Sequence, residues 1–319
     1  MTGDEMTRFN NDKGAQYRPI ESTGSKTRHL IALSFALIAT MTCGSAAQAA
    51  DNMPAMAKKA PRPELGSSAI FAPDGKLLVA AKQGEHVMIY RSADEGKTWS
   101  APVAVNAQPE AISADGENRP KLAFAADGGL LVSWTHPFPK PNTGSVRLAR
   151  ADDGLTFTSP ITVHQDQAII THRFESMLTT PDNKVILAWI DKRDLESAKN
   201  SKTPYRGAGI YAALSNDGGR SFQPEYKLAD HSCECCRVTS AIDHDGAPLF
   251  MWRHVYEPNE RDHALVRLKP DGAPETVKRA TFDRWKVDGC PHHGPSLVVD
   301  TQGVRHAVWF NQKEGEGRV

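Results

Sequence analysis

The chain has 319 residues, of which 39% are hydrophobic and 24% are charged, with 38 basic and 38 acidic side chains. This composition excludes a disordered polyelectrolyte and a membrane protein with several spans. The zero formal net charge argues against a nucleic-acid partner, which usually requires a basic face.

The first feature in chain order is a short apolar run, Leu30 to Thr42. It is preceded by Lys26 and Arg28 and followed by Ala47-Gln48-Ala49. A basic flank, a short apolar run and a small-x-small cleavage site are typical of a secretory signal peptide. The run is too short to span a bilayer comfortably, so we expect no stable membrane span after cleavage.

The signal sets the expected domain boundaries. Residues 1–49 form an N-terminal extension with the signal peptide at about 26–49, and residues 50–63 form a linker. The folded domain is expected over residues 64–319. We expect the mature protein to be periplasmic or secreted.

Short β-rich pairs recur around turn signals along the rest of the chain. The turns lie at Asp74-Gly75, Asp127-Gly128, Asp182-Asn183, Asp245-Gly246 and Gln302-Gly303, with separations of 53 to 63 residues. Such dipeptides indicate hairpins, because these turns often need positive φ. The spacing therefore predicts five inner hairpins of one repeated module.

A second motif, S-x-D-x-G-x-T-W or a variant, follows each of the first three hairpins, and the fourth unit keeps only Asp271-Gly272. The Asp carboxylate can accept backbone N–H groups, Gly supplies the special dihedral angle, and the aromatic residue packs the turn onto the sheet. We therefore expect a structural role for Ser92, Asp94, Gly96, Trp99, Asp152, Gly154, Phe157, Ser215, Asp217, Gly219 and Phe222.

This motif is the Asp-box, or BNR repeat, and three copies in register resemble the sialidase-like β-propeller superfamily. The resemblance implies an all-β propeller of four-stranded blades, usually six, with the Asp-box between the third and fourth strands. The fifth hairpin stops shortly after Trp309. We therefore expect about five blades and a C-terminally incomplete propeller.

In such blades the hairpin turns and Asp-boxes share one face. The segments before each first strand and the loops after each second strand then surround the central opening on the other face. Ionisable side chains concentrate there, as in a binding funnel, although a solvated loop face with inter-blade salt bridges would look similar. Candidate funnel residues are Arg119, Arg173, Glu175, Asp191, Arg237, His254, His292 and His293.

The resemblance makes exo-sialidase the first enzyme hypothesis. Sialidases use three arginines to clamp the substrate carboxylate, a Tyr/Glu nucleophile pair and an Asp acid/base. The family's first Arg is absent from residues 64–66, and its Asp is absent from residues 82–86. Candidate catalytic residues are then only Arg119, Arg173, Glu175 and Arg237.

We therefore expect a ligand-binding propeller, for a glycan or a soft metal ion, without the full sialidase catalytic set. The alternatives are a glycoside hydrolase and a structural or partner-binding propeller.

Of the five cysteines, Cys43 lies in the expected signal peptide, which leaves four in the mature chain. They fall at two successive blade starts: Cys233, Cys235 and Cys236 at one, and Cys290 at the next. In an exported protein an even number favours disulfides, such as Cys235 or Cys236 with Cys290. Thiolates and imidazoles also select copper or zinc, and ligand softness favours copper. Candidate metal ligands are Cys233, Cys235, Cys236, Cys290, His292 and His293. A redox-active thiol pair is the third alternative.

Overall fold

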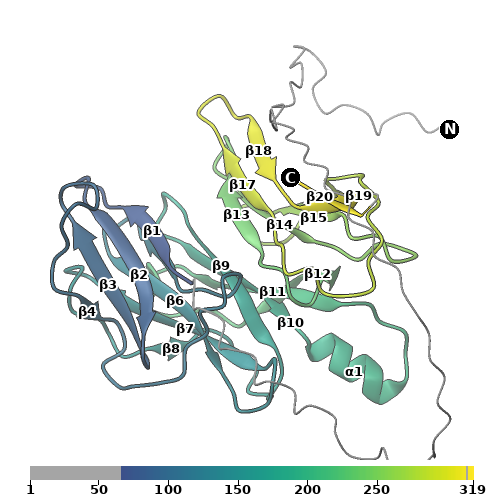
Figure 1. Cartoon of the computed structure of the whole chain (residues 1–319), viewed down its shortest axis with the longest axis horizontal. Helices are drawn as coiled ribbons and strands as arrows, with labels where there is room; N and C mark the ends of the chain where they lie inside the picture. The colour runs from purple at the N-terminus through teal and green to yellow at the C-terminus, as the bar shows by residue number, and fades with distance from the viewer. Residues whose placement is uncertain (1–65, 314) are drawn as a thin grey trace, which may run out of the picture. The chain divides into compact units, whose positions relative to one another are not determined.

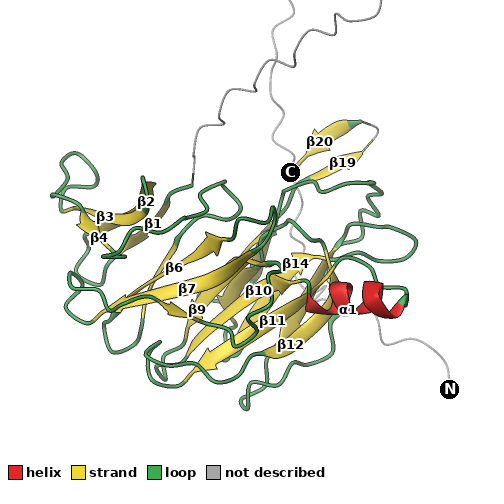
Figure 2. Ribbon diagram, turned by 90° about the horizontal axis from the view of Figure 1, so that it is seen from below, coloured by secondary structure: helices red, strands yellow, loops and turns green. Residues whose placement is uncertain are grey.

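The computed structural model describes residues 66–313 and 315–319. This part of the chain consists of β-strands, turns and one helix, α1 (Arg193–Ser201), as Figures 1 and 2 show. The expected signal peptide and linker, and residues 64 and 65 of the expected domain, lie outside the described residues. No helix within the described ranges is long and apolar enough to cross a membrane.

Four antiparallel sheets of four strands, here called blades one to four, follow one another along the chain. Blade one holds β1 (Ser68–Phe71), β2 (Leu77–Gln83), β3 (His86–Ser92) and β4 (Val103–Ala104). Blade two holds β5 (Lys121–Phe124), β6 (Leu130–Pro137), β7 (Gly144–Ala151) and β8 (Ile161–Thr162). Blade three holds β9 (His172–Thr179), β10 (Val185–Asp191), β11 (Ala208–Ser215) and β12 (Tyr226–Ser232). Blade four holds β13 (Thr239–Ile242), β14 (Pro248–Arg253), β15 (His263–Arg267) and β16 (Lys278–Arg279).

A fifth hairpin continues the series as blade five, with β17 (Ser296–Val299) and β18 (Arg305–Val308). The pair β19 (Asn311–Lys313) and β20 (Glu316–Arg318) forms a separate two-stranded sheet. The first strands of successive blades contact one another: β1 with β5, β5 with β9, β9 with β13, and β13 with β17. The predicted all-β propeller with about five blades is therefore confirmed.

Each predicted hairpin turn contains one residue with positive φ. That residue is glycine in four turns, with φ between 81° and 88°, and Asn183 with φ 64° in blade three. Left-handed backbone carries little penalty for Gly and is tolerated by Asn, which explains the sequence signal. In blade two Asp127 Oδ1 also accepts the Gly129 N–H at 3.2 Å.

The Asp-box holds the turn between the third and fourth strands. Ser92 Oγ donates to Asp94 Oδ1 at 2.7 Å and accepts from the Gly96 N–H at 2.7 Å. Hydrogen bonds from Thr98 and Ser92 lower the pKa of Asp94 to about 2. Blade three repeats the geometry, since Ser215 Oγ donates to Asp217 at 2.7 Å and accepts from Gly219 at 2.8 Å. These side chains serve the turn.

The second Asp-box differs from the expectation. Asp153, not Asp152, accepts the turn N–H groups, including that of Thr156 at 2.7 Å. Asp152 instead receives a hydrogen bond from Arg150 Nε at 2.6 Å. Arg150 stands where the other copies have Ser, and its guanidinium holds the earlier carboxylate away from the turn. Asp153 therefore accepts the turn hydrogen bonds that were expected for Asp152.

The hydrophobic core lies between blades. One apolar cluster joins blades one and two, a second joins two and three, a third joins three and four, and a smaller one joins four and five. The second strands supply Trp134, Trp189 and Trp252, all 0% exposed. A second strand is buried on both faces because it lies between two neighbouring sheets, as β10 shows along its whole length.

The turn after the third strand of blade four lacks the aromatic residue that the other three blades have there. The turn after each third strand closes through a backbone hydrogen bond from Ser100 to Arg91, Thr158 to Arg150, Gln223 to Leu214, or Glu275 to Arg267. The residue before the donor is Trp99, Phe157, Phe222 or Pro274, in blade order. Phe157 packs into the core between blades one and two, and Phe222 into the next. The turn of blade four therefore supplies no aromatic side chain to the core between blades three and four.

Blades four and five are joined by ion pairs of the Asp243 carboxylate, and a substitution of Asp243 tests their contribution to stability. Its carboxylate accepts hydrogen bonds from Arg267 at 2.6 Å and from Arg305 at 2.5 Å. Burial would raise the pKa of Asp243, but the bonds from Arg305 and the His244 N–H lower it to about 2. We expect Asp243→Asn to cost about 1–3 kcal/mol of unfolding free energy at pH 6, because the charged acceptor is lost.

The sign of the pH dependence follows from a depressed pKa. The contribution is present above the unfolded pKa of about 4 and is lost as pH falls towards 2. Urea unfolding should therefore show that wild type and Asp243→Asn differ less in unfolding free energy at pH 3 than at pH 6. Asp271→Asn, on an exposed turn of the same blade, is the control. A gap that widens in acid would contradict this account.

Candidate functional site

The segments that precede the first strands converge, and we call them the mouth: residues 115–120, 233–238 and 290–295, with the start of β9. Glu117 Oε2 accepts the N–H of Arg237 at 3.0 Å and that of Gly294 at 2.8 Å. Its Oε1 forms an ion pair with the Arg237 guanidinium. Glu117 of blade two therefore joins the starts of blades four and five, which lie far along the chain.

Blade three joins the mouth through Asn118. This side chain is fully buried, and its Oδ1 accepts the Phe174 N–H at 2.9 Å and the Thr135 hydroxyl at 2.7 Å. Phe174 has φ 61°, a left-handed conformation that turns β9 towards this contact. The neighbouring Arg173 Nη2 lies 3.2 Å from Asp115 Oδ2. The first strands are thus connected by side-chain to backbone hydrogen bonds at one face.

All four thiols gather in the mouth. Cys233 Sγ lies 3.4 Å from Cys236 Sγ and 3.9 Å from Cys235 Sγ. The sulfur atoms of Cys233, Cys235 and Cys290 lie within 4.8 Å of one another. All four are free cysteines in this structure. Two segments from different blades thus form one sulfur cluster.

The fold explains why three of these thiols are buried. The segment leaves β12 through His231, which has φ 62°, and the Cys233 N–H then donates to the Arg253 carbonyl at 2.8 Å. This bond holds the segment against the end of β14. Cys233, Cys235 and Cys236 are 0%, 6% and 1% exposed and belong to the apolar core between blades three and four. Cys290 is exposed.

Arginines surround the cluster. Arg261 Nη1 approaches Cys233 Sγ at 3.6 Å. Hydrogen bonds from Cys235, Cys236 and Cys290 lower the pKa of Cys233, and Arg261 adds to the effect. The bond with Cys233 raises the pKa of Cys235 and of Cys236. The Arg261 guanidinium thus favours negative charge at Cys233 Sγ within this group of thiols.

The buried Arg253 fixes the second segment. Its guanidinium donates to the carbonyls of Arg261 at 2.7 Å, His293 at 3.0 Å and Phe310 at 2.6 Å. Nearby, burial lowers the pKa of His263 to about 3, so this imidazole is neutral at ordinary pH. Arg253 therefore holds the residues that follow Cys290 beside the end of β14.

The candidate arginines of an anion clamp are each engaged elsewhere. Arg237 pairs with Glu117, Arg173 pairs with Asp115, and Arg119 donates to the Gly116 carbonyl at 2.9 Å. Glu175 is fully buried, and its carboxylate lies 3.0 Å from Thr135 Oγ1 and 3.6 Å from Lys121 Nζ. These are structural contacts within the mouth and between blades.

The other candidate funnel residues have separate surroundings. Asp191 accepts from Arg193 and, at 3.0 Å, from Trp189 Nε1. His254 packs on Tyr256, with ring centroids 4.2 Å apart, and burial lowers its pKa to about 4. His292 and His293 are exposed and are not part of the group of close sulfur atoms. The four cysteines are therefore the candidates that the structure gathers most closely.

Sequence reasoning did not select Glu117, Asn118, Arg253 or Arg261 as site residues. Glu117 and Asn118 stand beside the chosen Arg119, and no motif distinguishes them. Their roles depend on partners more than 50 positions away in sequence. Arg261 lies in the loop between β14 and β15, where no repeat position marks it.

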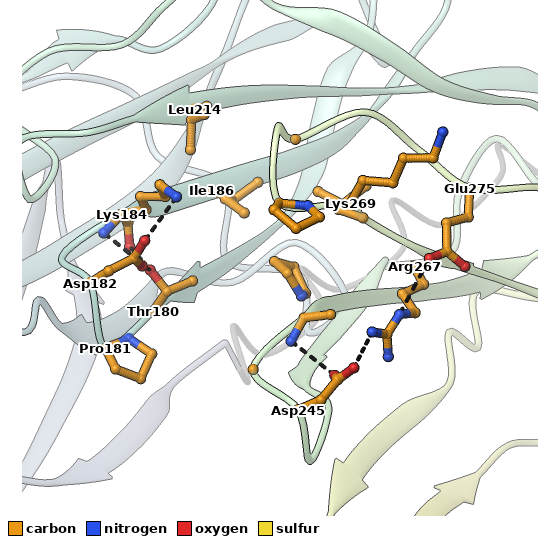
Figure 3. Close-up of a pocket in the computed structure, with 16 residues that line it drawn as sticks. Thr180, Pro181, Asp182, Lys184, Ile186, Leu214, Asp245, Arg267, Lys269 and Glu275 are labelled. Carbon is orange, nitrogen blue, oxygen red and sulfur yellow. Dashed lines mark hydrogen bonds and ion pairs between the residues drawn. The ribbon is translucent and has the colours of Figure 1, made fainter.

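A cavity of about 460 Å³ lies between blades three and four on the turn face, away from the cysteines (Figure 3). Ile186, Leu214 and Pro248 give it apolar walls. Its rim carries the ion pairs of Asp182 with Lys184 and of Arg267 with Asp245 and Glu275. It occupies the interface where the blade-four turn supplies no aromatic residue. We therefore attribute it to the degenerate fourth repeat.

Comparison of the sequence with protein-family models and with curated proteins gives no match. Solved structures do match. An α-L-arabinanase from Penicillium chrysogenum, solved with arabinobiose, is 16% identical, with TM-score 0.54 over 79% of each chain. A protein of unknown function from Dyadobacter fermentans is 18% identical, with TM-score 0.55 over 79% of this chain and 74% of that one.

An α-L-arabinofuranosidase from Fusarium graminearum is 14% identical, with TM-score 0.54 over 77% of this chain and 73% of that one. At these identities the likeness shows the fold alone. The chain has the β-propeller fold that the Asp-box repeats predicted.

Removing the carboxylate of Glu117 tests the architecture of the mouth. Glu117→Ala leaves the Arg237 guanidinium and two backbone N–H groups without their acceptor, so we expect a loss of about 1–3 kcal/mol of unfolding free energy. Glu196→Ala is the control, because it breaks an exposed pair on α1 and should change stability by less than about 0.5 kcal/mol. Equal urea midpoints for the two variants would refute the linking role of Glu117.

Proposed function

We propose that this protein is an exported β-propeller that binds one thiophilic metal ion, Cu(I), through the cysteines of its mouth. The observation that carries the proposal is the convergence of three sulfur atoms, from two blades, within 4.8 Å of one another. The proposal also holds that the mouth does not hydrolyse sialosides.

The donor set favours a soft ion. Thiolates bind Cu(I) and Zn(II) strongly, whereas Mg²⁺ and Ca²⁺ prefer oxygen ligands. Structural zinc takes four ligands in a tetrahedron. Here Cys233, Cys235 and Cys290 are mutually close, and Cys236 lies 3.4 Å from Cys233. Because every one of these ligands is a soft sulfur atom, copper is favoured over zinc.

The surroundings support thiolate ligands. Arg261, at 3.6 Å from Cys233 Sγ, provides positive charge for sulfur atoms that lose their protons on binding. Cys233 and Cys236 lie within the apolar core, which limits access of oxidants and water. A thiol site in an exported protein needs such protection, because disulfides form readily in oxidising compartments.

A glycan ligand is the second candidate function. It is favoured by the named activities of two proteins with the same fold, an arabinanase and an arabinofuranosidase. Two ion pairs argue against sialoside hydrolysis, because paired guanidinium groups are not free to clamp a carboxylate. These pairs are Arg173 with Asp115 and Arg237 with Glu117. The metal proposal therefore comes first.

Metal binding by the reduced protein tests the proposal. We expect the apoprotein, kept without oxygen, to bind one Cu(I) per chain in competition with a chromophoric Cu(I) chelator. Cys233→Ser should weaken the affinity at least about 100-fold, since losing a ligand exceeds the 10–100-fold effect of an outer-shell partner. Ser232→Ala is the matched control, because it changes an equally buried neighbour and keeps all thiols.

Two outcomes would overturn the metal proposal. One is an unchanged affinity in Cys233→Ser. The other is a native protein with two disulfides and no free thiols, whose reduced form binds neither Cu(I) nor Zn(II) above the level of the serine variant.

The absence of sialidase chemistry is a separate prediction. Incubation with a fluorogenic sialoside should release no more fluorophore than buffer does, because the candidate arginines are engaged in structural contacts. A fluorogenic α-L-arabinofuranoside, tested in parallel, examines the glycan alternative. Release from the sialoside that disappears in Arg237→Ala would contradict the proposed function directly.

A further inference from the structure

We propose that Cys290 is the ligand through which the mouth exchanges Cu(I) with a second thiolate-bearing carrier, so that the protein takes part in copper transfer. This inference rests on the proposed function, because it concerns the same thiol site. It assigns unequal roles to the sulfur atoms: Cys233 and Cys235 retain the ion, and Cys290 passes it in or out.

The first observation is the unequal burial of the thiols. Cys233, Cys235 and Cys236 are at most 6% exposed, whereas Cys290 is exposed. All four sulfur atoms nevertheless belong to one cluster, because Cys290 Sγ lies within 4.8 Å of Cys233 and Cys235. An incoming ligand from solvent can therefore meet the cluster at Cys290 first.

The second observation is the unequal support of the two segments. The segment of Cys233 is fixed by its hydrogen bond to the Arg253 carbonyl and by the apolar core. The Cys290 segment is held on either side, by the bond from Asn259 to Asp288 at 2.6 Å and by that from Gly294 to Glu117. Within the described ranges, the backbone groups of residues 289–292 have no hydrogen-bond partner. This short arch has fewer restraints than the segment that carries the other three thiols.

The chemistry of exchange needs no change of oxidation state. A carrier presents Cu(I) bound by two thiolates, and the Cys290 thiol loses its proton as its sulfur forms a bond to the ion. One carrier thiolate then leaves and takes up a proton. Cys233 displaces the second carrier thiolate in the same way. Cys235 then binds the ion as it releases its proton to solvent, and copper remains Cu(I) throughout. Because Cys290 is the exposed member of the cluster, its sulfur can bond the incoming ion before the buried sulfur atoms do.

Two imidazoles stand beside this exchange point. His292 and His293 are exposed and follow Cys290 by two and three positions. They are not members of the close sulfur group, so we assign them no role in holding the ion. Neutral imidazole nitrogen is a good Cu(I) ligand, and these side chains can bind the ion transiently while the carrier is still attached. The partner chemistry is therefore a Cu(I)–thiolate complex.

The test measures exchange separately from binding. The mature chain, loaded with one Cu(I) under anaerobic conditions, is mixed with excess bathocuproine disulfonate, and release is followed by absorbance. Loading is followed in the reverse direction with Cu(I)–glutathione and with a Cu(I)-loaded Cys-x-x-Cys peptide, which distinguishes a small thiol from a protein donor. The variants are Cys290→Ser and, as matched control, Cys236→Ser, which removes a buried thiol of the same cluster.

We expect Cys290→Ser to retain one Cu(I), more weakly, on Cys233 and Cys235, and to exchange it at least tenfold more slowly than wild type. Cys236→Ser should bind more weakly but exchange no more slowly. In the apoprotein, iodoacetamide should alkylate Cys290 before the buried cysteines, and bound Cu(I) should protect it.

Each contrary result has a distinct meaning. Exchange in Cys290→Ser within twofold of wild type would overturn the exchange role while leaving metal binding intact. A Cys290→Ser variant that binds no copper, beside a wild type that does, would show that Cys290 is a holding ligand and would also overturn the inference. Failure of wild type to bind Cu(I) at all would instead remove the proposed function.

Discussion

The carboxylate of Glu117 sets the geometry on which the mouth depends. The blades otherwise pack against their immediate neighbours through apolar clusters, as expected for a repeat array. Glu117 reaches from blade two to Arg237 of blade four and Gly294 of blade five. These two partners follow Cys236 by one position and Cys290 by four. The same carboxylate therefore limits how far the two cysteine segments can separate, and it connects the fold of the array directly to the distance between sulfur atoms.

The thiol cluster packs well in the core when its cysteines are neutral and less favourably when they are deprotonated. Cysteine in an apolar core behaves as a small hydrophobic residue, and Cys233 and Cys236 fill space between blades three and four in that way. Deprotonation places negative charge in the same core, which is unfavourable unless it is compensated. Arg261 lies close enough to Cys233 to offset part of that charge, and a bound cation would offset more. The arrangement thus favours the metal-bound state over free thiolates.

The repeat signals in the sequence predicted the fold because they are local. A positive-φ turn and an Asp that accepts backbone N–H groups are each determined within about ten residues, and both appear in the structure. The sequence did not predict the role of a side chain whose hydrogen-bond partner lies far away along the chain. Asp153 replaces Asp152 in the second Asp-box because Arg150 binds the earlier carboxylate, and Arg150 is itself held by Gly218 of the next blade. The fates of Arg173 and Arg237 likewise depended on acidic partners more than 50 positions away.

Blade four departs from the other repeats at both of its faces, and the two departures share one core. On the turn face it lacks the closing aromatic residue, and a cavity borders Ile186 and Leu268. At the mouth it carries three cysteines, and Cys233 and Cys236 belong to the same apolar cluster as those two residues. The cavity and the cysteines therefore border one interface, between blades three and four, from opposite faces. A ligand that binds only the folded state stabilises it by mass action. An ion bound at the mouth would thus stabilise the same blade interface that holds the cavity on the turn face, which would give metal binding a structural consequence at a distance from the sulfur atoms.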